Sequence, residues 1–197
     1  MPADTLTERL ILEPLDDAPP ELVEALFRIQ SDPATWEHLP GGADADLAET
    51  QSLIDGYARS WREQGLGWWA VRLRTPLGQL PAGEVIGLGG VAIRKPEVPA
   101  WNLGFRLTPA SWGYGFAAEL GRAAIDAARV AQPDVPVTAR ALTRNAASWR
   151  TLERTGLSLV WEGAAAADDP LTSGLERRVY SDRALSAELL AQLIALG

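Results

Sequence analysis

The 197-residue sequence predicts an α/β (α+β) fold, a mixed sheet flanked by helices, and two observations predict it. First, alternating apolar residues typical of consecutive antiparallel strands cover three segments, 68–74, 84–93 and 101–107. Second, a glycine turn at 112–117 leads into an amphipathic helix over 118–132, with Glu119 on its polar side, and then an apolar strand over 135–142. Strand, helix and strand in that order form a parallel unit, so the sheet is expected to contain both orientations.

The segment before these strands is expected to supply one strand and two helices. Thr7 to Pro14 forms the opening strand, which ends at its proline and the turn cluster that follows. Helical spacing predicts a helix over 21–30, introduced by Pro20, and a second over 46–63, with a loop over 31–42 between them.

The last third of the chain is expected to complete the sheet and add a closing helix. Asn145 caps a helix that ends at Gly156. Three elements and one insertion follow: strands over 157–162 and 175–183, an Ala- and Asp-rich flexible loop over 163–174 between them, and a helix over 187–196. That helix has an apolar stripe, which is explained either by packing on its own domain or by a homodimer interface. The stripe consists of Leu189, Leu190, Leu193, Ile194 and Leu196.

Length and composition indicate one ordinary globular domain. We expect residues 1–197 to form a single domain, since domains typically run to about 100–200 residues, and the 47% hydrophobic and 22% charged content argues against disorder. No basic-then-apolar leader and no run of about 18 apolar residues is present, which predicts a cytoplasmic protein without a membrane partner.

Charge and residue usage exclude several kinds of chemistry. The chain has no cysteine and one histidine, His38, so disulfides, thiolate ligands, a cysteine nucleophile and a multi-histidine metal cluster are excluded, and we expect no metal. A net charge of −8 argues against nucleic acid as a partner, because that affinity comes from clustered Lys and Arg. A single phosphorylated cofactor needs only local dipoles and one or two arginines.

The glycine turn carries the clearest chemical signal. Gly113 and Gly115 allow the backbone to approach a ligand closely, and the first turn of the following helix offers unpaired N–H groups at the positive end of its dipole. Together these predict a site for an anion such as phosphate. The competing interpretation is a tight turn without a ligand.

Six local motifs, taken in order, resemble the GNAT superfamily of acyl-CoA N-acetyltransferases, in particular the branch of ribosomal-protein N-terminal (RimJ/RimL-like) acetyltransferases. The resemblance extends from about Thr7 to Tyr180. The motifs are Arg9–Leu12, Val85–Gly90, Leu103–Leu107, Trp112–Ala117, Asn145–Ser148 and Leu152–Leu157. The resemblance implies a seven-stranded mixed sheet that is splayed between its fourth and fifth strands, with acetyl-CoA as co-substrate in the opening and an extra C-terminal helix.

The resemblance also implies which residues hold the cofactor. The implied cofactor-binding set is Phe105, Arg106, Leu107, Trp112, Gly113, Tyr114, Gly115, Phe116, Ala117, Asn145 and Ser148. In the family, main-chain groups of the fourth strand pair with the pantetheine arm and the glycine loop wraps the pyrophosphate. Trp112 stands where the family commonly has Gln or Arg, which leaves phosphate binding to backbone N–H groups.

Two departures from the family pattern concern proton transfer. Leu152 stands seven residues after Asn145, where many members have a tyrosine that protonates the thiolate, and Asn102 stands where others have a glutamate base. The implied catalytic residues are therefore Ser148, as donor to the leaving sulfur, and Asn145, which is also a good helix N-cap.

The acceptor site is expected to involve Trp36, His38, Trp101 and Asn102. Burial in the core is the competing interpretation for the tryptophans. The acidic residues Asp44, Asp46 and Glu49 either attract a cationic amine or form a solvated helix face.

The leading functional hypothesis is an acetyl-CoA-dependent N-acetyltransferase. An amine, either a peptide or protein N-terminus or a small amine, attacks the thioester directly in a ternary complex. The alternative is a non-catalytic acyl-CoA-binding module. A nucleotide-binding domain unrelated to CoA is disfavoured, because no Lys-Ser/Thr pair follows the glycines and no G-x-G-x-x-G motif is present.

Overall fold

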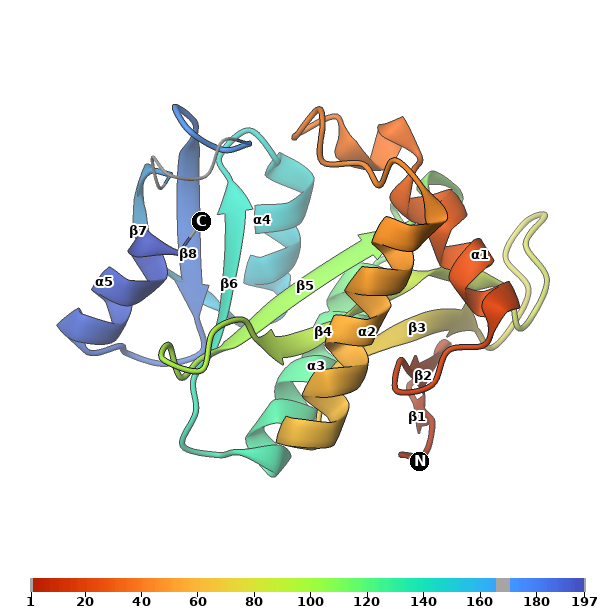
Figure 1. The fold of residues 1–197 in the computed structure, drawn as a ribbon, viewed down its shortest axis with the longest axis horizontal. Helices are drawn as coiled ribbons and strands as arrows, with labels where there is room; N and C mark the ends of the chain where they lie inside the picture. Colours follow the sequence, from red (N-terminus) through yellow and green to blue (C-terminus); the bar gives the residue numbers. More distant parts are fainter. Residues whose placement is uncertain (1, 166–170, 197) are drawn as a thin grey trace.

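A computed structural model describes residues 2–165 and 171–196 of the chain. They form an eight-stranded mixed sheet in the order β1-β2-β3-β4-β5-β6-β8-β7, with helices against its faces (Figure 1). The strands are β1 (Thr5–Leu6), β2 (Leu10–Pro14), β3 (Trp68–Leu73), β4 (Val85–Ile93), β5 (Trp101–Leu107), β6 (Val137–Leu142), β7 (Ser158–Ala164) and β8 (Glu176–Ser181). The helices are α1 (Pro20–Gln30), α2 (Leu47–Gln64), α3 (Phe116–Ala131), α4 (Ala146–Arg154) and α5 (Ala187–Ala195), with short 3₁₀ turns η1 (Pro33–Trp36) and η2 (Pro109–Ser111).

The N-terminal edge of the sheet differs from the sequence prediction. The expected opening strand over 7–14 begins only at Leu10, and Thr5–Leu6 forms a separate strand paired antiparallel with β2, which raises the expected seven strands to eight. A turn separates the two strands because the Thr7 hydroxyl accepts from the Leu10 N–H at 3.0 Å.

Helix α2 begins with a side-chain N-cap. The Asp46 carboxylate accepts from the Glu49 N–H at 3.0 Å, and the Glu49 carboxylate accepts from the Ala45 N–H at 2.8 Å. The first bond satisfies an N–H group of the first turn that has no partner within the helix, and the second holds the residue before the N-cap against that turn. These two acidic residues therefore serve the helix start.

Two helical layers enclose the sheet. Helices α1 and α2 pack over β3–β5 on one face, where Leu22, Leu26, Ile54 and Leu88 form a buried cluster. Helices α3 and α4 cover the opposite face, where the larger core is centred (Figure 1). Glu119 of α3 was expected on the exposed side of its helix but is only 8% exposed.

The sheet is splayed at its parallel step. Strand β5 pairs with β6 only from Trp101 to Leu103, opposite Val137 to Ala139. On its other edge β5 stays paired with β4 along its whole length, to Leu107. The second half of β5 therefore has one free edge, which faces the gap left by β6.

The C-terminal helix packs on its own chain. Leu193 and Leu196 are buried with Val98 and Ala100 of the β4–β5 connection. Part of the apolar stripe is thus used within the chain, and a homodimer remains a prediction. The predicted flexible loop over 163–174 contains residues 166–170, which lie outside the described part of the chain. No helix among the described residues is long and apolar enough to span a membrane.

Candidate functional site

A cavity of about 1180 Å³ occupies the splayed region of the sheet. Its walls come from the connection between α1 and α2, the second half of β5, the glycine loop, the end of β6 and the first turns of α3 and α4. The position fits the rule that ligands of open sheets bind where neighbouring parallel strands diverge.

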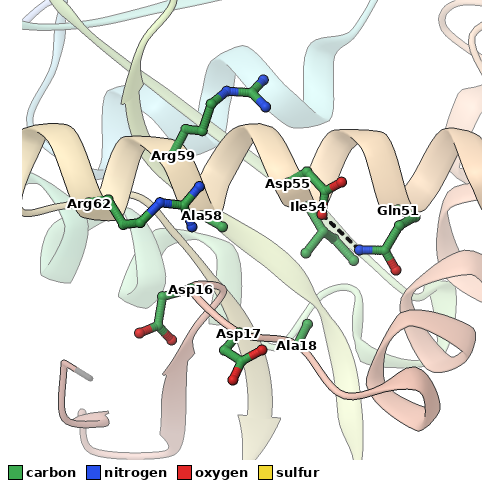
Figure 2. Close-up of a pocket in the computed structure, with 9 residues that line it drawn as sticks. All are labelled: Asp16, Asp17, Ala18, Gln51, Ile54, Asp55, Ala58, Arg59 and Arg62. Carbon is green, nitrogen blue, oxygen red and sulfur yellow. Dashed lines mark hydrogen bonds between the residues drawn. The ribbon is translucent and has the colours of Figure 1, made fainter.

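A second pocket of about 380 Å³ lies elsewhere, against α2. Figure 2 shows Asp16, Asp17 and Ala18 beside this helix, which supplies the other lining residues. Its walls carry charges of both signs, from Asp16, Asp17, Asp55, Arg59 and Arg62, and they include neither a glycine loop nor a free strand edge. The larger cavity is therefore the candidate site.

The free edge of β5 presents main-chain groups to the cavity. In antiparallel pairing, alternate residues direct both N–H and C=O toward the same neighbour. The Thr108 N–H donates to the Ile86 carbonyl oxygen next to β4, so the main chain of Arg106 also faces β4, while Phe105 and Leu107 face the gap. Arg106 is thereby separated from the predicted main-chain cofactor contacts, because strand alternation turns its backbone away.

The glycine loop has the geometry expected of an anion cradle. Gly113 and Gly115 have φ of 83° and 82°, values that favour glycine, and Gly115 is the N-cap of α3. No described residue accepts a hydrogen bond from the N–H groups of residues 113–118. A row of free donors at the positive end of a 16-residue helix suits a phosphate or another anion.

An ion pair anchors this loop to the N-terminal turn. Arg9 contacts the Glu119 carboxylate at 2.7 Å, and another of its nitrogens, Nη1, donates to the Tyr114 carbonyl oxygen at 2.8 Å. Glu119 also accepts from the Thr7 hydroxyl and the Arg9 N–H. Burial alone would raise the pKa of Glu119, but the bonds from Thr7 and Arg9 lower it below its ordinary value. The anchor thus contains an ionised glutamate.

Aromatic side chains of the loop are not equivalent. The Trp112 indole N–H donates to the Leu107 carbonyl oxygen at 2.8 Å, which ties the loop to the end of β5. Trp112 and Tyr114 are half exposed, whereas Phe116 is buried in the core. Phe116 therefore offers its backbone N–H to a ligand, while the first two also offer ring surface.

Asn145 and Ser148 lie together at the start of α4. The Asn145 side-chain oxygen accepts from the Ser148 N–H at 3.1 Å, as an N-cap does. No described residue accepts from the Asn145 side-chain NH₂ or from the Ser148 hydroxyl. Both residues line the cavity, so these donors remain available to a ligand.

The opposite wall is formed by the connection between α1 and α2. The Trp36 indole donates to the Gln30 carbonyl oxygen at 2.6 Å, and its ring stacks with His38 at a centroid distance of 6.2 Å. The Arg144 Nε donates to the His38 carbonyl oxygen at 2.5 Å, which connects this wall to the loop before α4. Burial, followed by the charges of Arg106 and Arg144, lowers the pKa of His38 to about 4. His38 is neutral at pH 7.

Of the four predicted acceptor residues, three line the cavity and one does not. Trp36, His38 and Asn102 are on its wall. Trp101 is fully buried in the core, because its side chain shares the α3 face of β5 with Leu103, so the prediction for Trp101 was wrong. The Trp68 ring packs against Gly104 of β5, so closely that a Cβ atom at residue 104 would lie 2.5 Å from the ring.

The contacts of several site residues carry no signal that a single sequence reveals. Arg9, Glu119 and Arg144 act through partners about 105 to 110 positions away in the chain. Glu119 lies in the first turn of α3, where an acidic residue is favourable in any helix, and helix periodicity assigned its side chain to the solvent side. No group of three or more His, Asp or Glu side chains within 2–165 and 171–196 is placed to hold a metal ion.

The chain is similar in sequence to one protein family and in fold to many solved structures. The family described as "Acetyltransferase (GNAT) domain" matches residues 9–158. An acetyltransferase from Agrobacterium tumefaciens is 26% identical, with a TM-score of 0.71 over 93% of this chain and 96% of that one.

Two solved structures with bound ligands share the fold at lower identity. The Microcin C7 self immunity acetyltransferase MccE, in complex with acetyl-CoA and AMP, is 14% identical, with a TM-score of 0.66 over 89% of this chain and 92% of that one. RimL, a ribosomal alpha-N-protein acetyltransferase in complex with coenzyme A, is 16% identical, with a TM-score of 0.67 over 90% and 95%.

Proposed function

The chain belongs to the GNAT acetyltransferase domain family, and from that premise we propose that it transfers the acetyl group of acetyl-CoA to a primary amine within a ternary complex. The observation that supports this most is the continuity between two features of the cavity. The free main-chain groups of Phe105 and the free N–H of Leu107 lead directly to the N–H groups of residues 113–118, which have no acceptor among the described residues. An acyl-pantetheine arm that ends in a pyrophosphate needs both in that order.

The open space at the glycine loop fits a pyrophosphate. A Cβ built at Gly113 would meet nothing within 4 Å, and one at Gly115 would meet only an Arg9 nitrogen, at 3.8 Å. The loop therefore leaves room for a ligand beside its donors. MccE and RimL were solved with acetyl-CoA and coenzyme A, respectively, which supports the same assignment here.

The proposed chemistry is attack of a neutral amine on the thioester carbonyl, with departure of the CoA thiolate. The Phe105 N–H stabilises the developing oxyanion, because it faces the cavity without a strand partner. The Asn145 NH₂ holds a pantetheine carbonyl, and the Ser148 hydroxyl donates to the departing sulfur. These assignments give the chain's own groups the roles of positioning and charge stabilisation.

The proton leaving the amine goes to water in this proposal. His38 is too weak a base for an ammonium ion, with its pKa near 4. Asn102 and Leu152 do not ionise, and Leu152 is buried. The lack of an ionisable group at these two positions favours the second candidate, an acyl-CoA-binding module without turnover.

Two measurements test the proposal. Calorimetry with acetyl-CoA, CoA and ATP should give micromolar binding of the first two, and binding of ATP without CoA would contradict the assignment. Turnover of amines and peptides can be followed with a thiol reagent, because the chain has no cysteine to react. Binding without CoA release above the hydrolysis rate, for every acceptor, would favour the binding module.

Replacing Ser148 with alanine is expected to slow turnover about 10-fold while the Kd for acetyl-CoA stays nearly unchanged, since one neutral donor to sulfur is lost. The measurement is kcat, with the Kd from calorimetry. The control is Ser52→Ala, at an exposed position of α2. An unaltered kcat in Ser148→Ala would remove this hydroxyl from the mechanism.

The remaining parts of the proposal concern the whole protein. Residues 1–197 act as one N-acetyltransferase domain, because the family match and the structural matches extend over most of the chain. The acceptor is a peptide or protein N-terminus, as the name of RimL suggests for that protein, or a small amine. A cytoplasmic location and a homodimer remain predictions.

A further inference from the structure

The cavity wall near Trp36 and His38, at the predicted acceptor site, contains a cation that forms no ion pair with any described residue. Side chains alternate between the two faces of a strand, and Trp101 and Leu103 of β5 lie on the α3 face. The Arg106 side chain therefore lies on the opposite face, which α1 and α2 cover. Its guanidinium lies 3.2 Å from the centre of the Trp36 ring. One nitrogen, Nη1, donates to the Thr35 carbonyl oxygen and, at 3.2 Å, to the Thr35 hydroxyl.

The rest of the guanidinium is unused. Among the described residues, none accepts from Nε or Nη2 of Arg106, and no carboxylate lies within 4.0 Å. Burial lowers the pKa of Arg106 to about 10, although Asp44 and Tyr57 act to raise it, so the group is charged at pH 7. Asp44 itself accepts from the Thr50 hydroxyl at 2.5 Å.

A partly buried arginine without a carboxylate has a net cost in the free protein, because its lost hydration is not replaced. A planar fork with one free edge, formed by Nε and Nη2, suits an oxyanion, which it binds through parallel charge-assisted bonds. The stacking on Trp36 and the two bonds to Thr35 fix the direction of this fork. Such preorganisation reduces the entropy lost on binding a ligand.

The charges that line the cavity are mostly positive. Six arginines line the cavity, and Glu37 is the one carboxylate among its described lining residues, although the chain as a whole carries −8. Arg140 and Arg177 donate to carbonyl oxygens at the end of α5, and Arg144 donates to His38. Asp46 and Glu49, which sequence alone left as candidates to attract a cationic amine, cap α2 instead.

We propose that the amine acceptor of this site also carries an oxyanion, a carboxylate or a phosphate, which binds the free edge of Arg106. This inference rests on the proposed function. It favours acidic peptides and anionic small amines over polyamines and aminoglycosides, whose positive charges would be repelled by Arg106 and Arg144. Arg106 is thus a specificity-determining residue for the acceptor, and its main chain does not contribute to the cofactor site.

Matched acceptor pairs test this inference. We would measure kcat/KM for the tripeptides Ala-Glu-Ala and Ala-Gln-Ala, blocked at their C-termini, and for phosphoethanolamine and ethanolamine. The wild-type protein should prefer at least one anionic member by roughly 10- to 100-fold, the range for hydrogen bonds to charged groups. The peptide pair reports a carboxylate, and the ethanolamine pair reports a phosphate.

Variants of Arg106 test whether this residue causes the preference for anionic acceptors. Arg106→Gln should reduce the preference to about 1, whereas Arg106→Lys should keep part of it, because the charge remains while the fork is lost. Arg28→Gln, at an exposed position near the end of α1, removes one charge outside the cavity and should keep the full preference. Circular dichroism and the Kd for acetyl-CoA establish that each variant is folded.

The outcomes separate this inference from the proposed function. Absence of acetyl-CoA binding in the wild-type protein would overturn the proposed function. If acetyl-CoA binds, two results would overturn the inference alone. One is a kcat/KM for both neutral acceptors that equals or exceeds that of their anionic counterparts, and the other is no turnover of either anionic acceptor. A preference that survives in Arg106→Gln would also overturn it.

Discussion

Replacing Gly115 with glutamate is expected to weaken acetyl-CoA binding by about 100-fold or more while the fold is retained. The new carboxylate would stand at the N-terminus of α3, where the N–H groups of residues 113–118 have no acceptor within the described part of the chain. It would compete with the pyrophosphate for these donors and repel it, and such like-charge contacts cost several kcal/mol. Calorimetry with acetyl-CoA measures the loss.

Retention of the fold follows from the local geometry. A non-glycine residue at the Gly115 φ of 82° costs about 1 kcal/mol. A negative charge at a helix N-terminus returns roughly 0.3–1 kcal/mol, and the nearest atom to the new Cβ is a nitrogen of Arg9. Thermal unfolding should therefore change little.

Gly115→Ala separates the effect of charge from the effect of backbone strain. It imposes the same φ penalty without the carboxylate, and its Cβ meets open space apart from Arg9. We expect its Kd for acetyl-CoA to stay within about 10-fold of wild type. Equal losses in the two variants would mean that loop conformation, rather than anion binding, sets the affinity.

The helices and strands were largely predictable because local signals specify them. Period-two alternation set β5 at 101–107, and Pro20, Asp46 and Asn145 marked the starts of three helices. The glycine loop was predictable for a related reason, since a positive φ at Gly113 and Gly115 is a local requirement of the chain. The splay between β5 and β6 was expected only through the family resemblance.

Contacts between distant segments were not predictable. Glu119 was assigned to the solvent side of α3 because helix periodicity describes one helix and not the turn that Thr7 and Arg9 place against it. Trp101 was expected in the acceptor site because the sequence does not tell which face of β5 meets the cavity and which meets α3. The orientation of the Arg106 guanidinium likewise depends on its contacts with Trp36 and Thr35, which lie about 70 positions away in the chain.

The anchor between Arg9 and Glu119 is expected to support both the fold and the cofactor loop. Arg9→Met should lower the free energy of unfolding by about 1–3 kcal/mol at pH 7, because it leaves the buried Glu119 carboxylate with fewer donors. The lower part of this range allows for the 39% exposure of the Arg9 side chain. The Kd for acetyl-CoA should rise roughly 10-fold, since the Tyr114 carbonyl oxygen loses its charged donor.

A double-mutant cycle measures the pair itself. Urea unfolding of wild type, Arg9→Met, Glu119→Gln and the double variant should give a coupling energy of about 1–2 kcal/mol at pH 7. Arg72→Met breaks a pair with Glu13, at 2.6 Å between β3 and β2, where neither residue lines the cavity, and should leave the Kd for acetyl-CoA unchanged. Additive single variants at pH 7, or an unchanged Kd in folded Arg9→Met, would remove the anchor from the cofactor site.

The pH dependence of that coupling has a definite sign. Hydrogen bonds from Thr7 and Arg9 outweigh burial and lower the pKa of Glu119 in the folded state, so the folded protein favours the ionised carboxylate more than the unfolded chain does. The resulting stabilisation is fully present above the ordinary glutamate pKa of about 4.3 and is lost as pH falls through the lower folded-state value. The coupling energy should therefore be constant from pH 7 to about 5 and decrease only at lower pH. A coupling that decreased between pH 7 and 5 would place the titrating group elsewhere.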